Sequence, residues 1–469
     1  MPKAPLIRIQ AVELFERQVR FRAPFRFGSV AVEEAPQAFV RAVIEVEGGA
    51  ASTGATAEMM MPKWFDKRRE STPDETVDQL RRSLILAADA YLSDQSLDTA
   101  FGHHAKILEE HFLRCAREDI PRLAAIYGPA LIDKAIADGL CRALDMNIFS
   151  GLNRNVFGID GSLTPDITST EIETYLQSRE PLSAVAVRHT VGMQDPIRGS
   201  GGLVEIAGIT GCRHFKLKLG GDIDFDIKRL AAIGKELDRI ERETKVTLDA
   251  NEQYGSAALI RDLLTEIERA ASLASVRRRL LYVEQPFPRD QTWESPLQDY
   301  AGISFIIDEA DDRYDSFPQA IALGYSGVSS KSCKGFYKSL INGVRAEKAS
   351  RESGGTYFLA AEDLTCQAGL AVQQDTALVA FLGIPHAERN GHHYGRGFGT
   401  APAGEVQAFL AAHPDLYRRS SHGAELALVD GTLHIESLSC PGFASAVHPI
   451  WHELSPIKTV TKAPKETVP

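Results

Sequence analysis

Charged residues stand repeatedly where a short apolar segment ends, between residues 214 and 334. Three carboxylates and one lysine share this placement: Asp249, Glu284, Asp308 and Lys331. For any one carboxylate the default interpretation is a structural salt bridge, because a buried carboxylate needs a partner. Three carboxylates that converge would repel one another, and a divalent cation would remove that repulsion. Mg²⁺ suits such a set because it keeps waters and accepts substrate oxygens, so the pattern indicates an enzyme with a metal site.

Lysines in the same stretch suggest a proton transfer. Lys216 and Lys218 share one face of a strand expected over 213–219, and Lys331 ends a strand expected over 326–331, because side chains alternate along a strand. An ordinary lysine is protonated, but a nearby metal ion and a second ammonium would lower the pKa of Lys218 and Lys331. One base on each side of a metal-bound carboxylate could remove an α-proton. The metal would stabilise the enediolate, and Lys216 would help to neutralise the carboxylate.

The elements that would position these residues form a regular repeat. Short apolar strands alternate with helical segments such as 224–243 and 336–352. The strands are expected over 184–192, 213–219, 245–250, 280–285, 303–308, 326–331, 356–361 and 384–388. Eight such repeats predict an α/β fold of the (β/α)8 TIM-barrel type, in which the carboxyl ends of the strands line the active site. A doubly wound sheet is the rival, but no Gly-rich fingerprint follows the first strand.

Three regions are expected along the chain. Residues 1–183 suit an α+β capping domain, with antiparallel strands first, helices over 74–150 and a clear amphipathic helix over 130–145. Segments near 21–30 and 57–65 are candidate substrate lids, although an ordinary hairpin loop and adaptable Met packing explain them as well. The barrel would span 184–400. Residues 401–469 would return to the capping domain through a hairpin that turns at Asp430-Gly431, with a loose tail from 459.

Composition narrows the class of protein. The net charge of −11 over 469 residues argues against a nucleic-acid surface, which needs clustered Lys and Arg. No apolar run approaches the roughly 20 residues that span a bilayer, and no signal-peptide core follows the N-terminus. The six cysteines are scattered without metal-binding spacing, which favours free thiols in a reducing cytosol. We therefore expect a cytoplasmic enzyme with a small-molecule partner, and a homo-oligomer because such assemblies are common.

The motifs resemble the enolase superfamily, whose sites use Lys or His bases with Mg²⁺. Within it the chain is similar to the muconate-lactonizing group. The likeness rests on Lys216-Leu217-Lys218 as the Lys-x-Lys strand, on the three carboxylates as metal ligands and on Lys331 as the opposing lysine. Mandelate racemase relatives would place a His at the end of strand seven, where this chain carries Glu362-Asp363. Residues 130–153 resemble the helix that closes the family's capping domain, and 423–443 its C-terminal hairpin, so the likeness covers nearly the whole chain.

Further residues are candidates for substrate contact: Lys216, Asn251, Lys334, Glu388 and Arg26. Asn251 shares a face with Asp249, and Arg26 hints at a second anionic or polar group on the substrate. The family motif Lys-x-x-Lys-x-Gly-Gly here runs Lys331-Ser332-Cys333-Lys334-Gly335-Phe336, and residues 271–279 look like an insertion. These departures leave the metal-binding and catalytic residues intact. They do put in doubt any inference of this chain's substrate from the substrate of a relative.

The resemblance implies a Mg²⁺-dependent enzyme, with Mn²⁺ as a possible substitute, that removes the proton α to a substrate carboxylate through Lys218 and Lys331. The enediolate would then lead to racemisation, epimerisation or cycloisomerisation, which makes the enzyme an isomerase. β-Elimination, as in dehydratases or succinylbenzoate-forming lyases, is the alternative. A barrel that binds a carboxylate without turnover is a remote rival, and a zinc hydrolase lacks the convergent His ligands.

Overall fold

Eight parallel strands close into a barrel in the computed structural model, which describes residues 4–27, 30–297, 302–395, 397–420 and 423–457. The strands are β4 (Ala184–Val191), β5 (His214–Lys218), β6 (Lys245–Asp249), β7 (Leu280–Glu284), β8 (Phe305–Ile307), β9 (Gly327–Ser330), β10 (Phe358–Ala361) and β11 (His386–Glu388). Each pairs with its neighbour in this order, and β11 pairs with β4. The predicted (β/α)8 barrel is therefore confirmed, and every strand begins and ends within two residues of its expected bounds.

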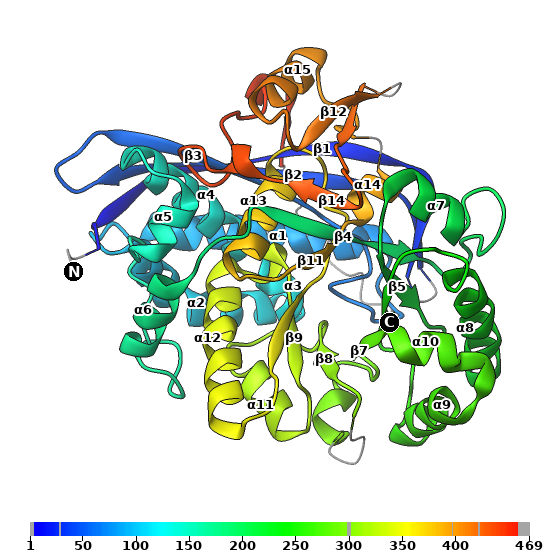
Figure 1. Cartoon of the computed structure of the whole chain (residues 1–469). Helices are drawn as coiled ribbons and strands as arrows, with labels where there is room; N and C mark the ends of the chain where they lie inside the picture. The colour runs from blue at the N-terminus through cyan, green and yellow to red at the C-terminus, as the bar shows by residue number, and fades with distance from the viewer. Residues whose placement is uncertain (1–3, 28–29, 298–301, 396, 421–422, 458–469) are drawn as a thin grey trace, which may run out of the picture.

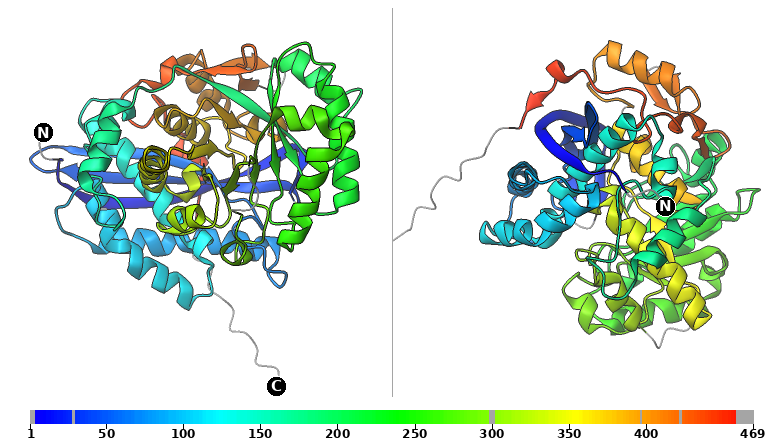
Figure 2. Two further views of the ribbon diagram at one scale, coloured as in Figure 1. Left: turned by 60° about the horizontal axis from the view of Figure 1, so that its bottom comes forward. Right: turned by 90° about the vertical axis from the view of Figure 1, so that its left-hand side faces the viewer.

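Helices surround the barrel strands (Figures 1 and 2). They are α7 (Leu203–Thr210), α8 (Ile223–Leu237), α9 (Ala257–Arg269), α11 (Ser316–Ala322), α12 (Phe336–Ser353), α13 (Leu370–Phe381) and α14 (Asn390–Tyr394), with short turns η2 (Gln291–Glu294) and η3 (Ser332–Lys334). In α9 the buried residues are Ile260, Leu263, Leu264 and Ile267, and the Ser256 side chain caps its first turn. This spacing gives one apolar stripe toward the barrel. The apparent insertion at 271–279 forms η1 (Ala271–Leu273) and α10 (Ala274–Arg279).

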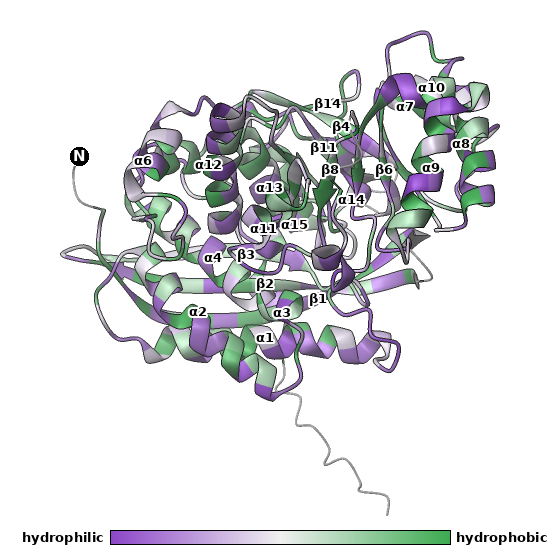
Figure 3. Ribbon diagram, turned by 90° about the horizontal axis from the view of Figure 1, so that it is seen from below, coloured by the Kyte–Doolittle hydropathy of each residue, from purple (hydrophilic) through white to green (hydrophobic). Residues whose placement is uncertain are grey.

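The N-terminal part of the chain forms an antiparallel sheet with helices beside it, along one side of the barrel (Figure 3). Its strands are β1 (Ile7–Phe27), β2 (Val30–Val46) and β3 (Ala51–Met59). Its helices are α1 (Pro73–Ser93), α2 (Ala100–Arg117), α3 (Arg122–Ala125), α4 (Tyr127–Ala143), α5 (Ile148–Asn153) and α6 (Ser169–Ser178). The candidate lid at 21–30 proves to be the end of a long hairpin, since β1 and β2 run on to Phe27 and from Val30. Residues 28–29 lie outside the described part.

One helix differs from its prediction. The segment 130–145 was expected to be amphipathic, but in α4 every residue from Tyr127 to Cys141 is buried. The reason is that α4 packs against β2 and β3 and also contacts η3 of the barrel. Its charged side chains have partners: Lys134 lies 3.1 Å from Glu58 and Asp138 lies 3.0 Å from Arg142.

The C-terminal segment reaches both domains. It contains α15 (Ala403–Ala412), β12 (Tyr417–Ser420), β13 (Gly423–Leu426), β14 (Thr432–His434), η4 (Glu436–Leu438), η5 (Trp451–Glu453) and β15 (Ser455–Pro456). The chain turns at Asp430-Gly431, both with positive φ, and β14 then pairs antiparallel with β4 of the barrel. β15 pairs with β1 of the capping sheet. The tail from 459 lies outside the described residues.

Two further features concern the environment of the chain. None of the six cysteines is paired with another, and five of them are buried. Among the residues that the structure describes, no helix combines the length and apolar character needed to cross a membrane.

Candidate active site

The predicted metal and catalytic residues meet at the carboxyl ends of the barrel strands. The strand register places Lys218 of β5 beside Asp249 of β6, and Asp249 beside Glu284 of β7. Asp308 directly follows β8 and Lys331 directly follows β9. All five side chains are buried, with exposed fractions between 0% and 6%. The chain thus gathers three carboxylates and two lysines at one end of the barrel.

A small cavity brings the two lysines together. Lys218 and Lys331 both line it, although they come from the second and the sixth strand of the barrel. The other predicted residues on its wall are Lys216, Asp249, Asn251 and Glu388. Met61 and Trp64 of the second candidate lid also line it, so the capping domain contributes to this wall.

Lys216 lies at the centre of a cluster of carboxylates. Its Nζ atom is 2.8 Å from Asp249, 2.8 Å from Glu284, 2.7 Å from Glu362 and 3.0 Å from Glu388. Burial alone would lower the pKa of Lys216, but these carboxylates raise it well above its ordinary value. Lys216 is therefore a fixed positive charge between strands that carry negative ones.

Each candidate catalytic lysine is held by a carboxylate. Lys218 Nζ donates to Asp249 Oδ2 at 2.6 Å and to Asn251 Oδ1 at 2.8 Å. Lys331 Nζ donates to Asp308 Oδ2 at 2.5 Å. Burial lowers the pKa of Lys331, but Asp308 together with Glu284 and Glu309 raises it, and the net value lies above the ordinary one. The lowered pKa of Lys331 was predicted for a site with a bound metal ion beside it, so it stays a prediction.

The donor set suits a hard divalent cation, which prefers oxygen ligands. Glu284 has no exposed surface, and its Oε2 atom lies 2.8 Å from Lys216 Nζ yet accepts no hydrogen bond. Burial, with Asp249 and Glu362 nearby, raises the pKa of Glu284 well above its ordinary value. Negative charge at this point therefore exceeds what the surrounding lysines neutralise, and a cation held by Asp249, Glu284 and Asp308 would fit.

The described residues contain no group of three His, Cys, Asp or Glu side chains already arranged around one point as metal ligands. The reason lies in the ion pairs: Asp249 contacts Lys216 and Lys218, while Asp308 contacts Lys331 and Lys334. Binding of a cation by these carboxylates would compete with those lysine contacts.

Two predicted substrate residues have other surroundings. Lys334 is buried and contacts Asp308 at 3.3 Å and Asp311 at 3.1 Å, and Ser329 Oγ accepts from it at 2.7 Å. It is not among the described residues that line the cavity. Arg26 lies in β1, with its side chain outside the described part of the structure. The substrate contacts of both residues remain predictions.

The second candidate lid is bonded to the barrel. Lys67 Nζ lies 2.5 Å from Glu252 and 3.0 Å from Glu309. Arg289 donates to the backbone oxygens of Trp64 and Phe65 at 3.1 Å and 2.9 Å. Lys67 reaches from the segment that follows β3 to the barrel, and Arg289 reaches from the barrel to this segment. Together these contacts fix the segment over the mouth of the barrel.

Three residues of this region, Glu362, Glu58 and Trp64, were not predicted individually as site residues, although Glu58 and Trp64 lie in the candidate lid at 57–65. Glu362 follows the apolar strand β10, the same placement that marked the other carboxylates, so that signal would have found it. Glu58 accepts from Ser332 Oγ at 2.8 Å, next to Lys331, and its signal was an isolated acid in the apolar segment 57–61. Trp64, whose ring lies near Lys331, carries no chemical signal in the sequence.

Comparison with known proteins supports the architecture. No family model matches the chain, and no curated protein matches its sequence. Solved structures do match. One is a mandelate racemase/muconate lactonizing enzyme from Roseovarius nubinhibens ISM, with a TM-score of 0.61 and 16% identity over 96% of this chain and 99% of that one.

Two further structures were solved with small molecules. A muconate lactonizing enzyme from M. smegmatis, complexed with muconolactone, has a TM-score of 0.61 and 18% identity over 96% of this chain and all of that one (100%). A dipeptide epimerase from Enterococcus faecalis V583, complexed with Mg and L-Leu-L-Tyr, has a TM-score of 0.59 and 16% identity over 93% and 99% of the two chains. The chain therefore has the fold of mandelate racemase and muconate lactonizing enzymes of the enolase superfamily.

Proposed function

We propose that the chain is a Mg²⁺-dependent isomerase that removes the proton α to a substrate carboxylate. The observation that carries this proposal is that Lys218 and Lys331, from the second and sixth strands, line one cavity beside three buried carboxylates. Two amines that reach one carbon from different sides can remove a proton on one face and return a proton on the other. Similar structures that are named for epimerisation and for lactonisation support the proposal.

Asp249, Glu284 and Asp308 would hold the cation. A bound cation would supply positive charge for the substrate carboxylate, whose negative charge grows as the α-carbon loses its proton. Lys216 adds a fixed positive charge from the barrel interior, and Asn251 positions Lys218 through the hydrogen bond to its Nζ. On the opposite side Asp308 and Trp64 position Lys331. The proton taken from the α-carbon would go to one lysine Nζ, and the other lysine would supply the proton that replaces it.

A screen in D₂O tests this function. The protein is incubated with MgCl₂ and a library of carboxylic acids, and the α-hydrogen is followed by NMR. Deuterium at the α-carbon of an intact skeleton would support an isomerase, whereas loss of a β-group would support elimination. Exchange with none of the acids would contradict both reactions, and a parallel sample with EDTA checks the requirement for metal.

A further inference from the structure

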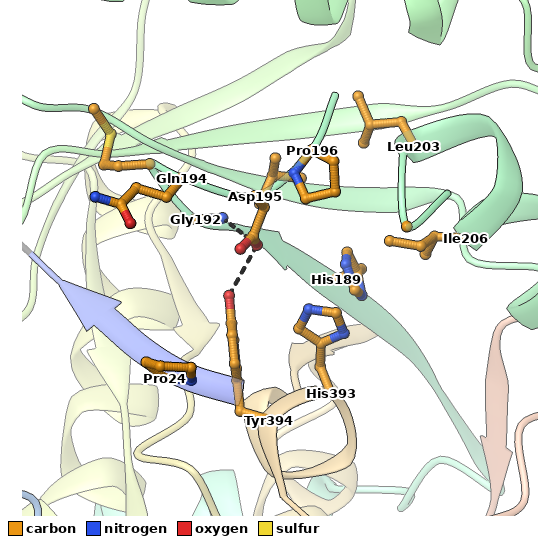
Figure 4. Close-up of a pocket in the computed structure, with 13 residues that line it drawn as sticks. Pro24, His189, Gly192, Gln194, Asp195, Pro196, Leu203, Ile206, His393 and Tyr394 are labelled. Atoms are coloured by element: carbon orange, nitrogen blue, oxygen red, sulfur yellow. Dashed lines mark hydrogen bonds between the residues drawn. The ribbon is translucent and has the colours of Figure 1, made fainter. Parts of the chain in front are cut away.

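A second cavity lies at the same end of the barrel, on the outer side of β4 (Figure 4). It encloses about 340 Å³, against about 20 Å³ for the cavity between the lysines. We call it the β4 pocket. Its walls come from β4 and the residues that follow it, from α7, from α14, and from Pro24 near the end of the β1–β2 hairpin. Four separate parts of the chain thus build one pocket, and one of them belongs to the capping domain.

Alternation along β4 separates the two cavities. Thr190 faces the barrel interior, where its hydroxyl donates to Glu388. His189 and Val191 therefore face outward, and both line the β4 pocket. Val191 pairs with Leu217 in the β4–β5 register, so Gly192, the next residue, is level with Lys218. The pocket thus opens beside the strand that carries a candidate base.

The lining is mostly apolar. Its apolar members are Pro24, Val191, Met193, Pro196, Leu203 and Ile206. The polar groups are largely engaged with one another: Asp195 Oδ2 accepts from Gly192 N at 2.8 Å and from Tyr394 OH at 2.9 Å. Burial lowers the pKa of His393 to about 4, so its ring is neutral at pH 7. A pocket with these walls suits an uncharged aryl or branched alkyl group rather than a second carboxylate.

Helix α14 connects the two cavities. Asn390, its first residue, lines the cavity between the lysines, whereas His393 and Tyr394 line the β4 pocket. Figure 4 shows the rings of His189 and His393 close together below Ile206, with the Tyr394 hydroxyl directed at Asp195. The two cavities therefore lie at opposite ends of one short helix.

We propose that the β4 pocket binds the distal end of the substrate, which makes the substrate a carboxylic acid with an aryl or branched alkyl group away from its carboxylate. This inference rests on the proposed function, because it assumes that the carboxylate end binds beside Lys218 and Lys331. It specifies the chemical nature of the distal end of the substrate, which the lysines and the metal ligands do not determine.

Titration calorimetry of the full chain in MgCl₂, with 4-phenylbutyrate and butyrate as probes, tests the inference. The phenyl acid is expected to bind at least about tenfold more tightly, the order of magnitude of one well-buried apolar contact. Ile206→Trp fills the pocket from α7 and Pro24→Trp fills it from the capping domain, and each is expected to abolish the difference. Ile209→Trp is the matched control, since Ile209 lies on the same helix with 74% of its surface exposed. Equal binding of the two acids, or a preference that survives both filling variants, would overturn the inference.

Two results separate this inference from the proposed function. Lys218→Ala is expected to lose isomerisation but to keep the preference for the phenyl acid. If acids exchange but none gains affinity from a phenyl group, the reaction stands and the pocket assignment is overturned. If the preference depends on Ile206 but no acid exchanges, the pocket binds ligands and its assignment to a substrate is overturned.

Discussion

The Nζ atom of Lys331 lies 4.2 Å from the centroid of the Trp64 ring. Lys331 follows β9 of the barrel, whereas Trp64 follows β3 of the capping domain. The capping domain therefore supplies one side of the surroundings of a candidate catalytic lysine. Cation–π contacts of this kind contribute roughly 0.5–2 kcal/mol, depending on how dry the site is. With both groups buried, this contact fixes the position of the ammonium that Asp308 binds from the other side.

Replacement of Trp64 should therefore impair turnover. We expect Trp64→Leu to lower the rate of α-hydrogen exchange by about twofold to thirtyfold, the range that 0.5–2 kcal/mol spans. Trp293→Leu is the matched control, because Trp293 makes a similar contact with Arg313, at 5.6 Å, and is not among the described residues that line the cavity between the lysines. Equal exchange rates for wild type and Trp64→Leu would show that the contact has no part in catalysis.

Asp308 has two roles in this account, as a cation ligand and as the partner of Lys331. Asp308→Asn should raise the dissociation constant for Mg²⁺ at least about tenfold, because even groups that only orient a ligand have effects of this size. Isothermal titration with MgCl₂ measures the change. Asp138→Asn serves for comparison, since Asp138 is equally buried and cation-paired but belongs to α4 of the capping domain. A Mg²⁺ affinity that Asp308→Asn leaves intact would remove Asp308 from the ligand set.

Glu58 joins the capping domain to the residue after Lys331. It accepts from Lys134 Nζ at 3.1 Å and from Ser332 Oγ at 2.8 Å, and Glu58 and Lys134 are almost fully buried. Glu58→Gln leaves a buried ammonium without its counter-charge, so the free energy of unfolding in urea should fall by about 3 kcal/mol.

The double variant Glu58→Gln/Lys134→Met removes both charges and should recover part of that loss. A double variant less stable than Glu58→Gln would show that this pair is not the source of the effect.

Buried histidines should make the fold sensitive to acid. Burial lowers the pKa of His111 to about 4, below the ordinary value near 6.5. The unfolded chain then binds more protons between these values, so stability is present above pH 6.5 and is lost as pH falls through 4.

The loss of unfolding free energy attributable to His111 should be about 3 kcal/mol between pH 6.5 and pH 4. His111→Gln should flatten the pH dependence of urea unfolding over this range. His452→Gln is the control, because the His452 side chain is 83% exposed. If the free energy of unfolding of His111→Gln depended on pH as steeply as that of the wild type, this role of His111 would be contradicted.

The barrel was predictable because each of its strands and helices is marked by a hydrophobic pattern within its own segment of the sequence. Each strand is a short, largely apolar segment between polar helical ones, and a charge at the end of most of them marks the candidate active-site edge. The same placement would have identified Glu362, whose contact with Lys216 repeats that of Glu284.

Contacts between distant segments were not predictable. The apolar pattern of α4 gives no sign that the sheet and η3 cover it on more than one side, and Glu58 meets Ser332 across 274 residues of sequence.

The central claim is that Lys218 and Lys331 move the α-proton. The most direct measurement is α-hydrogen exchange in D₂O with MgCl₂, for an acid that the wild type exchanges, in Lys218→Ala and Lys331→Ala. Each variant should lose isomerisation, and its remaining exchange should be confined to one face of the α-carbon, opposite for the two variants. Wild-type exchange in either variant would contradict the account.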